Sequence, residues 1–183
     1  MGSEQDVGRG EIAVGNFMKI SAQEEYGFRC LLRVAQVYGE SVTIPEIAEA
    51  EGLSIPYAGK LMGVLRQSGF VRSVRGQTGG YVLSRPPQQI AVADVLEALG
   101  GRIYEPQFCD EFAGVESVCT HSLDCSIRSL WRSVQRAIDG ALSGITLHDM
   151  LSDESAMASR LVIRETQSAP EPFGLLRTPA DRP

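Results

Sequence analysis

The sequence predicts a mainly α-helical fold with one small β-hairpin and a long helix towards the C-terminus. Apolar residues recur at helical spacing within residues 18–38, 43–51, 54–68 and 91–100. Two short alternating runs, FVRSVR and YVL, flank the Gly-rich loop GQTGG, which is typical of a β-hairpin. A further amphipathic stripe runs through residues 125–143.

The first expected helix spans residues 18–38. Ser21 is a suitable N-cap, and Glu24 stands three residues later, where a capping box needs it. Gly39 follows directly and is expected to end the helix, because glycine readily adopts the left-handed conformation found at helix C-termini.

The next two helices are short and lie close together in the chain. Thr43 can cap the helix of residues 43–51, and Pro45 suits its first turn. The turn GLS leads to a helix over residues 54–68, with Ser54 as its cap. Two helices joined by such a turn form a helix-turn-helix, and the hairpin after them adds a wing.

The pattern therefore predicts a winged helix-turn-helix plus a long C-terminal helix. The chain is expected to begin with a disordered leader over residues 1–17, followed by a winged helix-turn-helix domain over residues 18–100. A cysteine-bearing irregular loop should cover residues 101–125, and a long helix with a short helical turn residues 126–151. Residues 152–183 are expected to form a flexible tail.

Charge is distributed unevenly along the chain. The formal net charge is −6, which argues against a protein coated for nonspecific nucleic-acid binding. Residues 54–87 nevertheless contain no Asp or Glu. Such segregation of charge is what a phosphate-facing surface requires. The basic residues of this stretch are Lys60, Arg66, Arg72, Arg75 and Arg85.

The expected DNA-contacting residues lie at the start of the third helix, around the hairpin, and at Arg66. The N-terminal turn of the second helix in a helix-turn-helix meets the major groove, and basic wing residues can enter a minor groove. The alternatives are an ordinary solvated helix face and a hairpin with no function beyond its turn. The candidates are Ser54, Pro56, Tyr57, Lys60, Arg66, Arg72, Arg75, Gly79, Gly80 and Arg85.

Cys109, Cys119 and Cys125 form a C-x9-C-x5-C pattern. It is not a zinc-ribbon pattern, but three thiolates in one loop can hold an iron–sulfur cluster, which tolerates one non-Cys ligand. The alternative is buried cysteines that act as small apolar residues, which suits Cys30 better than the three in their polar loop. His121 is either a further ligand or a hydrogen-bonding loop residue.

Several classes of protein fit the sequence poorly. No segment is apolar for long enough to cross a membrane, and the N-terminus lacks the pattern of a secretory signal, so we expect a cytoplasmic protein with reduced thiols. Nothing indicates an enzyme, because the chain shows neither a nucleophile triad order nor a phosphate-binding loop. The long helix offers more apolar surface than a small domain needs, which favours a homodimer on a palindromic DNA site.

These segments together resemble the Rrf-two family of bacterial winged-helix regulators. The matching stretches are MKISAQEEYGFRCLLRVA, the helix-turn-helix and wing ending in RSVRGQTGGYVLSR, the cysteine loop, and SLWRSVQRAIDGALSGITLHDML. Coverage runs from residue 18 to residue 151. The resemblance implies a homodimer that binds double-stranded DNA at a pseudo-palindromic operator, with three cysteines ligating a cluster.

The fourth ligand differs between branches of that family. One branch uses a His three residues after the last cysteine, where this chain has Arg128. Other branches use an acidic residue near the start of the first helix, just before a Tyr and supplied by the partner subunit. Glu25, before Tyr26, occupies that position. Resemblance to the nitric-oxide-sensing branch favours [4Fe-4S] over [2Fe-2S].

The resulting hypothesis is a transcriptional regulator whose operator affinity is switched by a cluster that senses redox state, nitric oxide or iron–sulfur status. Its ligands would be Cys109, Cys119, Cys125 and Glu25. The alternative is a cluster-free regulator on the same DNA-binding dimer, which senses thiol oxidation or a small ligand.

Overall fold

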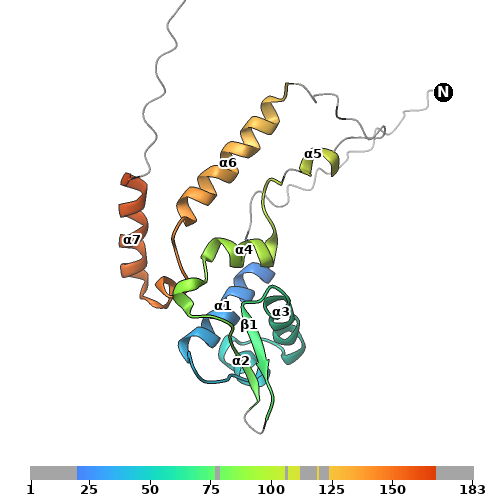
Figure 1. The fold of residues 1–183 in the computed structure, drawn as a ribbon, viewed down its shortest axis with the longest axis vertical. Coiled ribbons are helices and arrows are strands. Elements are labelled where there is room, and N and C mark those ends of the chain that lie inside the picture. Colours follow the sequence, from blue (N-terminus) through green and yellow to red (C-terminus); the bar gives the residue numbers. More distant parts are fainter. Residues whose placement is uncertain (1–19, 77–78, 106, 112–118, 120–123, 168–183) are drawn as a thin grey trace, which may run out of the picture.

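A computed structural model describes residues 20–76, 79–105, 107–111, 119 and 124–167. Helices α1 to α4 and the β1–β2 hairpin form a compact head (Figure 1), and α6 and α7 stand on one side of it. The elements are α1 Ala22–Gln36, α2 Ile44–Glu51, α3 Ile55–Gln67, β1 Val71–Val74, β2 Gly80–Leu83, η1 Pro87–Gln89, α4 Val92–Gly100, α5 Phe108–Glu111, α6 Ser126–Leu142, η2 Asp149–Leu151 and α7 Glu154–Gln167. The predicted fold class is confirmed.

The starts of the first helices are fixed by local capping, as the sequence predicts. The Glu24 backbone N–H donates to the Ser21 hydroxyl, and the Glu24 carboxylate accepts from the Ser21 N–H, which completes a capping box. Thr43 caps α2 in the same way. Because Ser21 is the cap, α1 begins at Ala22 rather than at the predicted residue 18, and it ends at Gln36.

The core lies between α1, α3, α4 and the inner face of the hairpin. Leu31, Leu61, Leu65 and Val95 are fully buried in it. Strands β1 and β2 pair antiparallel, and a bridge between Val42 and Tyr81 attaches the hairpin to the segment before α2. The wing is therefore held to the helix-turn-helix by main-chain hydrogen bonds.

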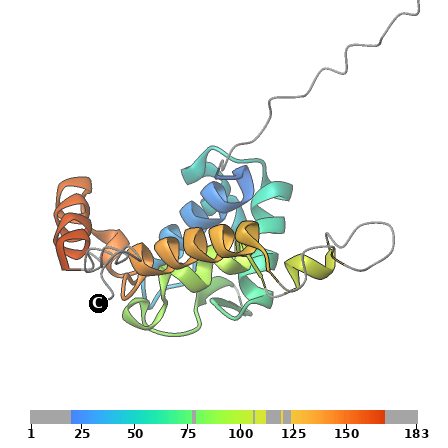
Figure 2. The same cartoon turned by 90° about the horizontal axis from the view of Figure 1, so that it is seen from above.

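Helix α6 crosses above α4 (Figure 2), and Arg102 and Tyr104, which follow α4, form hydrogen bonds with Asp139 and Gln135 of α6. The chain after α6 returns to the head, where the Val92 N–H donates to the Ile145 carbonyl at 3.0 Å and the Leu147 N–H donates to the Ile90 carbonyl at 2.8 Å. This return places α7 beside α6 (Figure 1).

Two segments differ from the sequence-based expectation. Residues 101–125 were expected to be irregular, but they contain the short helix α5. Residues 152–183 were expected to form a flexible tail, but α7 occupies residues 154–167. Asp153 accepts a hydrogen bond from the Ala156 N–H at the start of α7, and Arg160 pairs with Asp149 at 2.6 Å. These contacts give the helix a capped start and an attachment.

Candidate DNA interface and cysteine site

Helix α3 is anchored on one face and open on the other. Ser54 caps it by accepting a hydrogen bond from the Tyr57 N–H at 3.4 Å. Ala58, Leu61, Met62 and Leu65 are buried and fix the helix against the core. Of the predicted DNA-contacting residues here, Ser54, Pro56, Lys60 and Arg66 are exposed. Tyr57 is only half-exposed.

Tyr57 packs against α1 instead of pointing freely into solvent. Its ring meets the ring of Tyr26 edge-on, with 6.2 Å between centroids and 80° between planes. Such an edge-to-face pair is favourable for aromatic rings. The contact joins the start of α3 to α1.

The hairpin exposes Arg72 and Arg75 but uses its glycines for packing. A Cβ on Gly80 would lie 2.6 Å from the Val42 carbonyl oxygen, and one on Gly79 would lie 2.9 Å from the Val74 carbonyl oxygen. Both positions therefore require a residue without a side chain. DNA contact by these glycines stays a prediction, and the structure gives each a role in shaping the wing.

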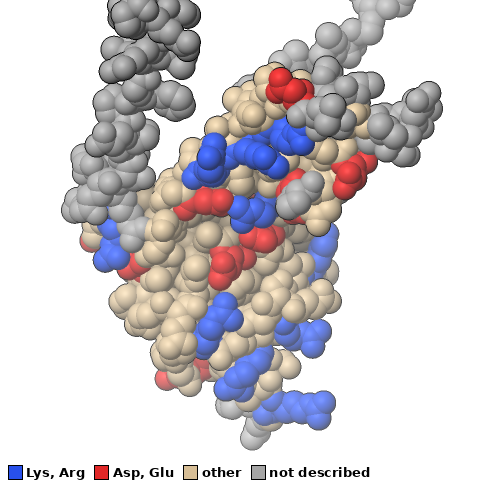
Figure 3. All heavy atoms as spheres, turned by 45° about the horizontal axis from the view of Figure 1, so that its top comes forward, with Lys and Arg blue, Asp and Glu red and all other residues tan. Residues whose placement is uncertain are grey.

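Arg85 is directed towards the protein. Its Nε donates to the Gln89 carbonyl at 3.1 Å, its Nη1 donates to the Gly69 carbonyl at 3.4 Å, and its guanidinium lies 5.2 Å from the centre of the Phe70 ring. These contacts hold the two ends of the hairpin together. Lys and Arg side chains lie at the lower end of the molecule in Figure 3, and others lie over its upper part beside Asp and Glu.

The cysteines of the predicted cluster site lie around the junction of α5 and α6. Cys109 is on α5, Cys125 is the N-cap of α6, and the Cys125 Sγ accepts a hydrogen bond from the Arg128 N–H at 3.3 Å. All three cysteines are free and half-exposed. In the part of the chain that the structure describes, no three His, Cys, Asp or Glu side chains come close enough to hold a metal ion. His121 lies outside the described residues.

Cys30 is chemically distinct from these cysteines. It is fully buried in the core on α1. Burial, reinforced by the negative charge of Glu51, raises the pKa of the Cys30 thiol to about 11. A thiol that stays protonated is a poor ligand and a poor nucleophile. The structure thus agrees with the expectation that Cys30 acts as an apolar core residue.

Glu25, the predicted fourth ligand, is about half-exposed on α1 and forms an ion pair within its own helix. The Arg29 Nη2 lies 2.5 Å from the Glu25 Oε1, and the Arg29 Nε donates to the same oxygen at 2.8 Å. The bond with Glu25 raises the pKa of Arg29. The Arg29 guanidinium also lies 5.5 Å from the centre of the Tyr26 ring. Arg29 thus contacts both Glu25 and the ring of Tyr26.

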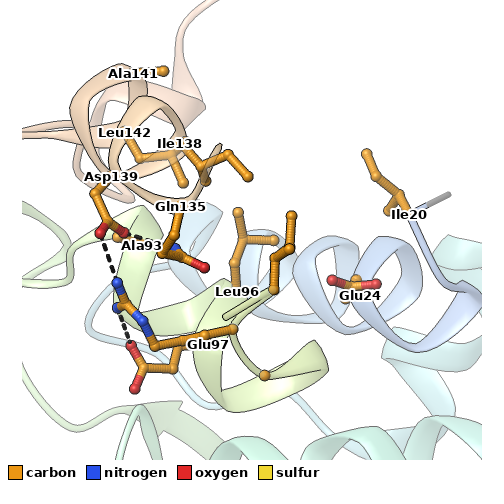
Figure 4. A pocket seen from close by; sticks show the side chains of 13 residues that line it. Ile20, Glu24, Ala93, Leu96, Glu97, Gln135, Ile138, Asp139, Ala141 and Leu142 are labelled. Atoms are coloured by element: carbon orange, nitrogen blue, oxygen red, sulfur yellow. Dashed lines mark hydrogen bonds and ion pairs between the residues drawn. The ribbon is translucent and has the colours of Figure 1, made fainter. Parts of the chain in front are cut away.

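Helix α6 faces α4 and the segment after it with both polar and apolar side chains, among them Gln135, Asp139, Ile138 and Leu142. Arg102 joins Glu97 at 3.0 Å and Asp139 at 2.6 Å (Figure 4), and Gln135 accepts a hydrogen bond from the Tyr104 N–H. A hollow of about 470 Å³ lies between α1, α4 and α6. Local sequence spacing does not predict this polar connection, because its partners are distant in the chain.

The outward side of α6 carries large apolar residues that are exposed among the described residues. Ile127 and Leu130 are 57% and 56% exposed. On the same helix only Gln135 is buried. An amphipathic helix that leaves its apolar face in water indicates a surface for association.

Comparison with known proteins identifies the family. A family model described as an iron-dependent transcriptional regulator, Rrf2, matches residues 20–153. The chain belongs to the Rrf2 family. It is a DNA-binding transcriptional regulator and not an enzyme, as predicted. No helix within the described residues is long and apolar enough to span a membrane.

Individual Rrf2 relatives match most of the chain. Protein rrf2 of Nitratidesulfovibrio vulgaris is 35% identical over 139 residues, which cover 75% of this chain and 90% of that protein. The structure of IscR from T. potens matches with a TM-score of 0.57 and 37% identity, and covers 73% of this chain and 86% of that one. The oxidised form of CymR from Staphylococcus aureus matches with a TM-score of 0.56 and 30% identity, and the match covers 74% of this chain and 98% of that one. The Rrf2 match ends before α7 begins.

Proposed function

We propose that this regulator is a cytoplasmic homodimer that binds a pseudo-palindromic operator, and that an iron–sulfur cluster controls its affinity for DNA. The DNA-binding part rests on α3 and the wing, which expose Ser54, Pro56, Lys60, Arg72 and Arg75 on a segment without acidic residues. An α-helix in the major groove with a basic hairpin beside it is a common mode of DNA binding.

The cluster part of the proposal rests on the donor set. Cys109, Cys119 and Cys125 are free and half-exposed, as ligand thiols must be before binding. Cys125 stands at the N-terminus of the 17-residue helix α6, where its Sγ accepts a hydrogen bond from the Arg128 N–H. Glu25 of the second protomer would be the fourth ligand, with His121 as the alternative.

A bound cluster, [4Fe-4S] rather than [2Fe-2S] by family resemblance, would supply a centre that reacts with oxidants or nitric oxide. A carboxylate is a harder ligand than a thiolate and suits iron–sulfur clusters less well. Glu25 is therefore the position at which binding would be lost first. When Glu25 is not a ligand, Arg29 holds its carboxylate, as it does in the structure.

Contacts of α1 provide a path from Glu25 to the DNA-reading helix. Arg29 stacks on Tyr26, and Tyr26 packs on Tyr57 at the start of α3. A shift of α1 that accompanies capture or release of Glu25 would move Tyr57, and hence α3 relative to its twin in the dimer. Coupling between two sites typically amounts to about 1–3 kcal/mol, which is enough to change operator occupancy.

The test is the visible spectrum, with iron and sulfide analysis, of protein purified without oxygen. We expect brown wild-type protein, colourless Cys119→Ala, and Glu25→Ala that loses iron faster to a chelator. Cys30→Ala is the matched control, because Cys30 is fully buried in the core and its loss should leave the colour unchanged. Colourless wild-type protein without iron would exclude the cluster.

A second candidate function is a thiol-based switch on the same DNA-binding dimer. The half-exposed free cysteines favour it, and a CymR relative has been solved in an oxidised form. In that case iron-free protein would change its operator affinity on treatment with peroxide, and Cys119→Ala or Cys125→Ala would abolish the change.

A further inference from the structure

Ile55 is an apolar residue in an unexpected place. It is the first residue of α3 and is 56% exposed. The other large exposed apolar residues within the described ranges lie outside α3; they are Ile20, Tyr38, Ile103, Ile127, Leu130 and Leu161. The exposure of Ile127 and Leu130 fits the outward face of α6, a surface for association. Ile55 lies on α3 and does not belong to that face.

The position of Ile55 is rigidly held. The residue before it, Ser54, caps the helix, and the residue after it, Pro56, fixes its own backbone angle. Ile is β-branched and strongly prefers one χ1 rotamer in a helix. The buried residues of the next turn, Ala58 and Leu61, secure α3 against the core. Ile55 therefore presents a fixed apolar surface at the tip of the helix that approaches DNA.

Only one group on the base edges of the major groove matches such a surface. The groove displays hydrogen-bond donors and acceptors, together with the C5-methyl group of thymine. An isoleucine can neither donate nor accept a hydrogen bond, and it gains nothing from a phosphate. We propose that Ile55 contacts a thymine methyl group in each operator half-site and thereby contributes to sequence specificity. This inference rests on the proposed DNA interface.

The experiment replaces thymine by deoxyuridine, which removes only the methyl group. Operator duplexes are first selected from a random pool with the full-length wild-type protein. Each thymine of one half-site is then changed singly to deoxyuridine. We expect one position at which binding weakens about fourfold, the equivalent of one buried methyl group at about 0.8 kcal/mol.

Protein variants assign that position to Ile55. Ile55→Ala should bind the thymine operator several-fold more weakly than wild type, and deoxyuridine at the sensitive position should then make no further difference. Leu161→Ala, which removes an exposed apolar side chain from α7, should behave as wild type. Circular dichroism confirms that each variant is folded.

Two results would overturn the inference while leaving DNA binding intact. One is an operator with no deoxyuridine-sensitive position. The other is a sensitive position that remains equally sensitive in Ile55→Ala, because another residue would then contact the methyl group. Failure to select any duplex, in contrast, would count against the proposed DNA interface itself.

Discussion

The Glu25 carboxylate pairs with Arg29 one turn further along α1, with 2.5 Å between Oε1 and Nη2. If Glu25 ligates a cluster in the partner subunit, Arg29 competes for the same oxygen. We predict that Arg29→Gln slows loss of iron to a chelator, roughly twofold, because exposed pairs one turn apart on a helix are weak. Iron release is followed by the fading of visible absorption.

Two comparisons make this prediction specific. Glu25→Ala with Arg29→Gln should release iron as fast as Glu25→Ala alone, because the carboxylate for which Arg29 competes is gone. Arg33→Gln, on the same helix, should leave the rate unchanged. Faster release from Arg29→Gln would mean that Arg29 supports the site.

Two glycines should respond to substitution in opposite directions. A Cβ on Gly63 in the middle of α3 meets open space, so Gly63→Ala should raise the free energy of unfolding by about 1 kcal/mol. A Cβ on Gly80 would overlap the Val42 carbonyl, which accepts a hydrogen bond from the Tyr81 N–H. Gly80→Ala should therefore lower the free energy of unfolding by about 1–3 kcal/mol. Urea titrations measure both changes, and changes in the same direction would contradict this account.

The difference between these glycines illustrates what the sequence could predict. Capping boxes at Ser21 and Thr43 were predictable, because their partners stand three residues away. The steric demand at Gly80 comes from Val42, which is distant in the chain. Long-range contacts of this kind are not encoded in local spacing.

The candidate site shows the same limit. Arg85 was expected to face DNA because it belongs to a basic stretch, but its hydrogen bonds go to Gly69 and Gln89. Arg160 of α7 pairs with Asp149, a contact that periodicity does not reveal. The ligand set and the dimer involve a second protomer and stay predictions.

Substitution of Arg75 should change DNA binding, whereas substitution of Arg85 should change the stability of the fold. Arg75 is exposed beyond β1, so Arg75→Ala should reduce the salt dependence of operator binding by about 0.9 in log–log slope, the value for one phosphate contact, without loss of stability. Arg85→Ala should lower the free energy of unfolding by about 1 kcal/mol, because two carbonyl groups lose their donor. Fluorescence anisotropy at several salt concentrations, beside urea titrations, tests both. An unchanged slope for Arg75→Ala would place that residue away from the phosphates.

The outward face of α6 predicts a variant that is folded but monomeric. Leu130 is 56% exposed in the single protomer, so Leu130→Asp should not disturb the head domain. A buried charge at a dimer interface would be costly, so the variant should sediment as a monomer. Operator affinity should fall by about a hundredfold or more, because two linked half-site contacts become one. Ser129→Asp adds the same charge at an exposed polar position of α6 and should remain dimeric. A dimeric Leu130→Asp protein would exclude this face as the interface.

Asp149 should make stability depend on pH in the acid range. Burial alone would raise the pKa of Asp149, but hydrogen bonds from the Thr146 N–H and hydroxyl, together with Arg160, outweigh burial and lower it. A carboxyl group with a lowered folded-state pKa stabilises the fold above its unfolded pKa, and that contribution disappears as the pH falls through the folded value.

We predict that Asp149→Asn lowers the free energy of unfolding by about 1 kcal/mol at neutral pH. The difference from wild type should shrink below about pH 4, the ordinary pKa of Asp. Urea titrations at neutral and acid pH measure it, with Glu40→Gln as an exposed control. A difference that stays constant with pH would mean that the charge of Asp149 contributes nothing to the attachment of α7.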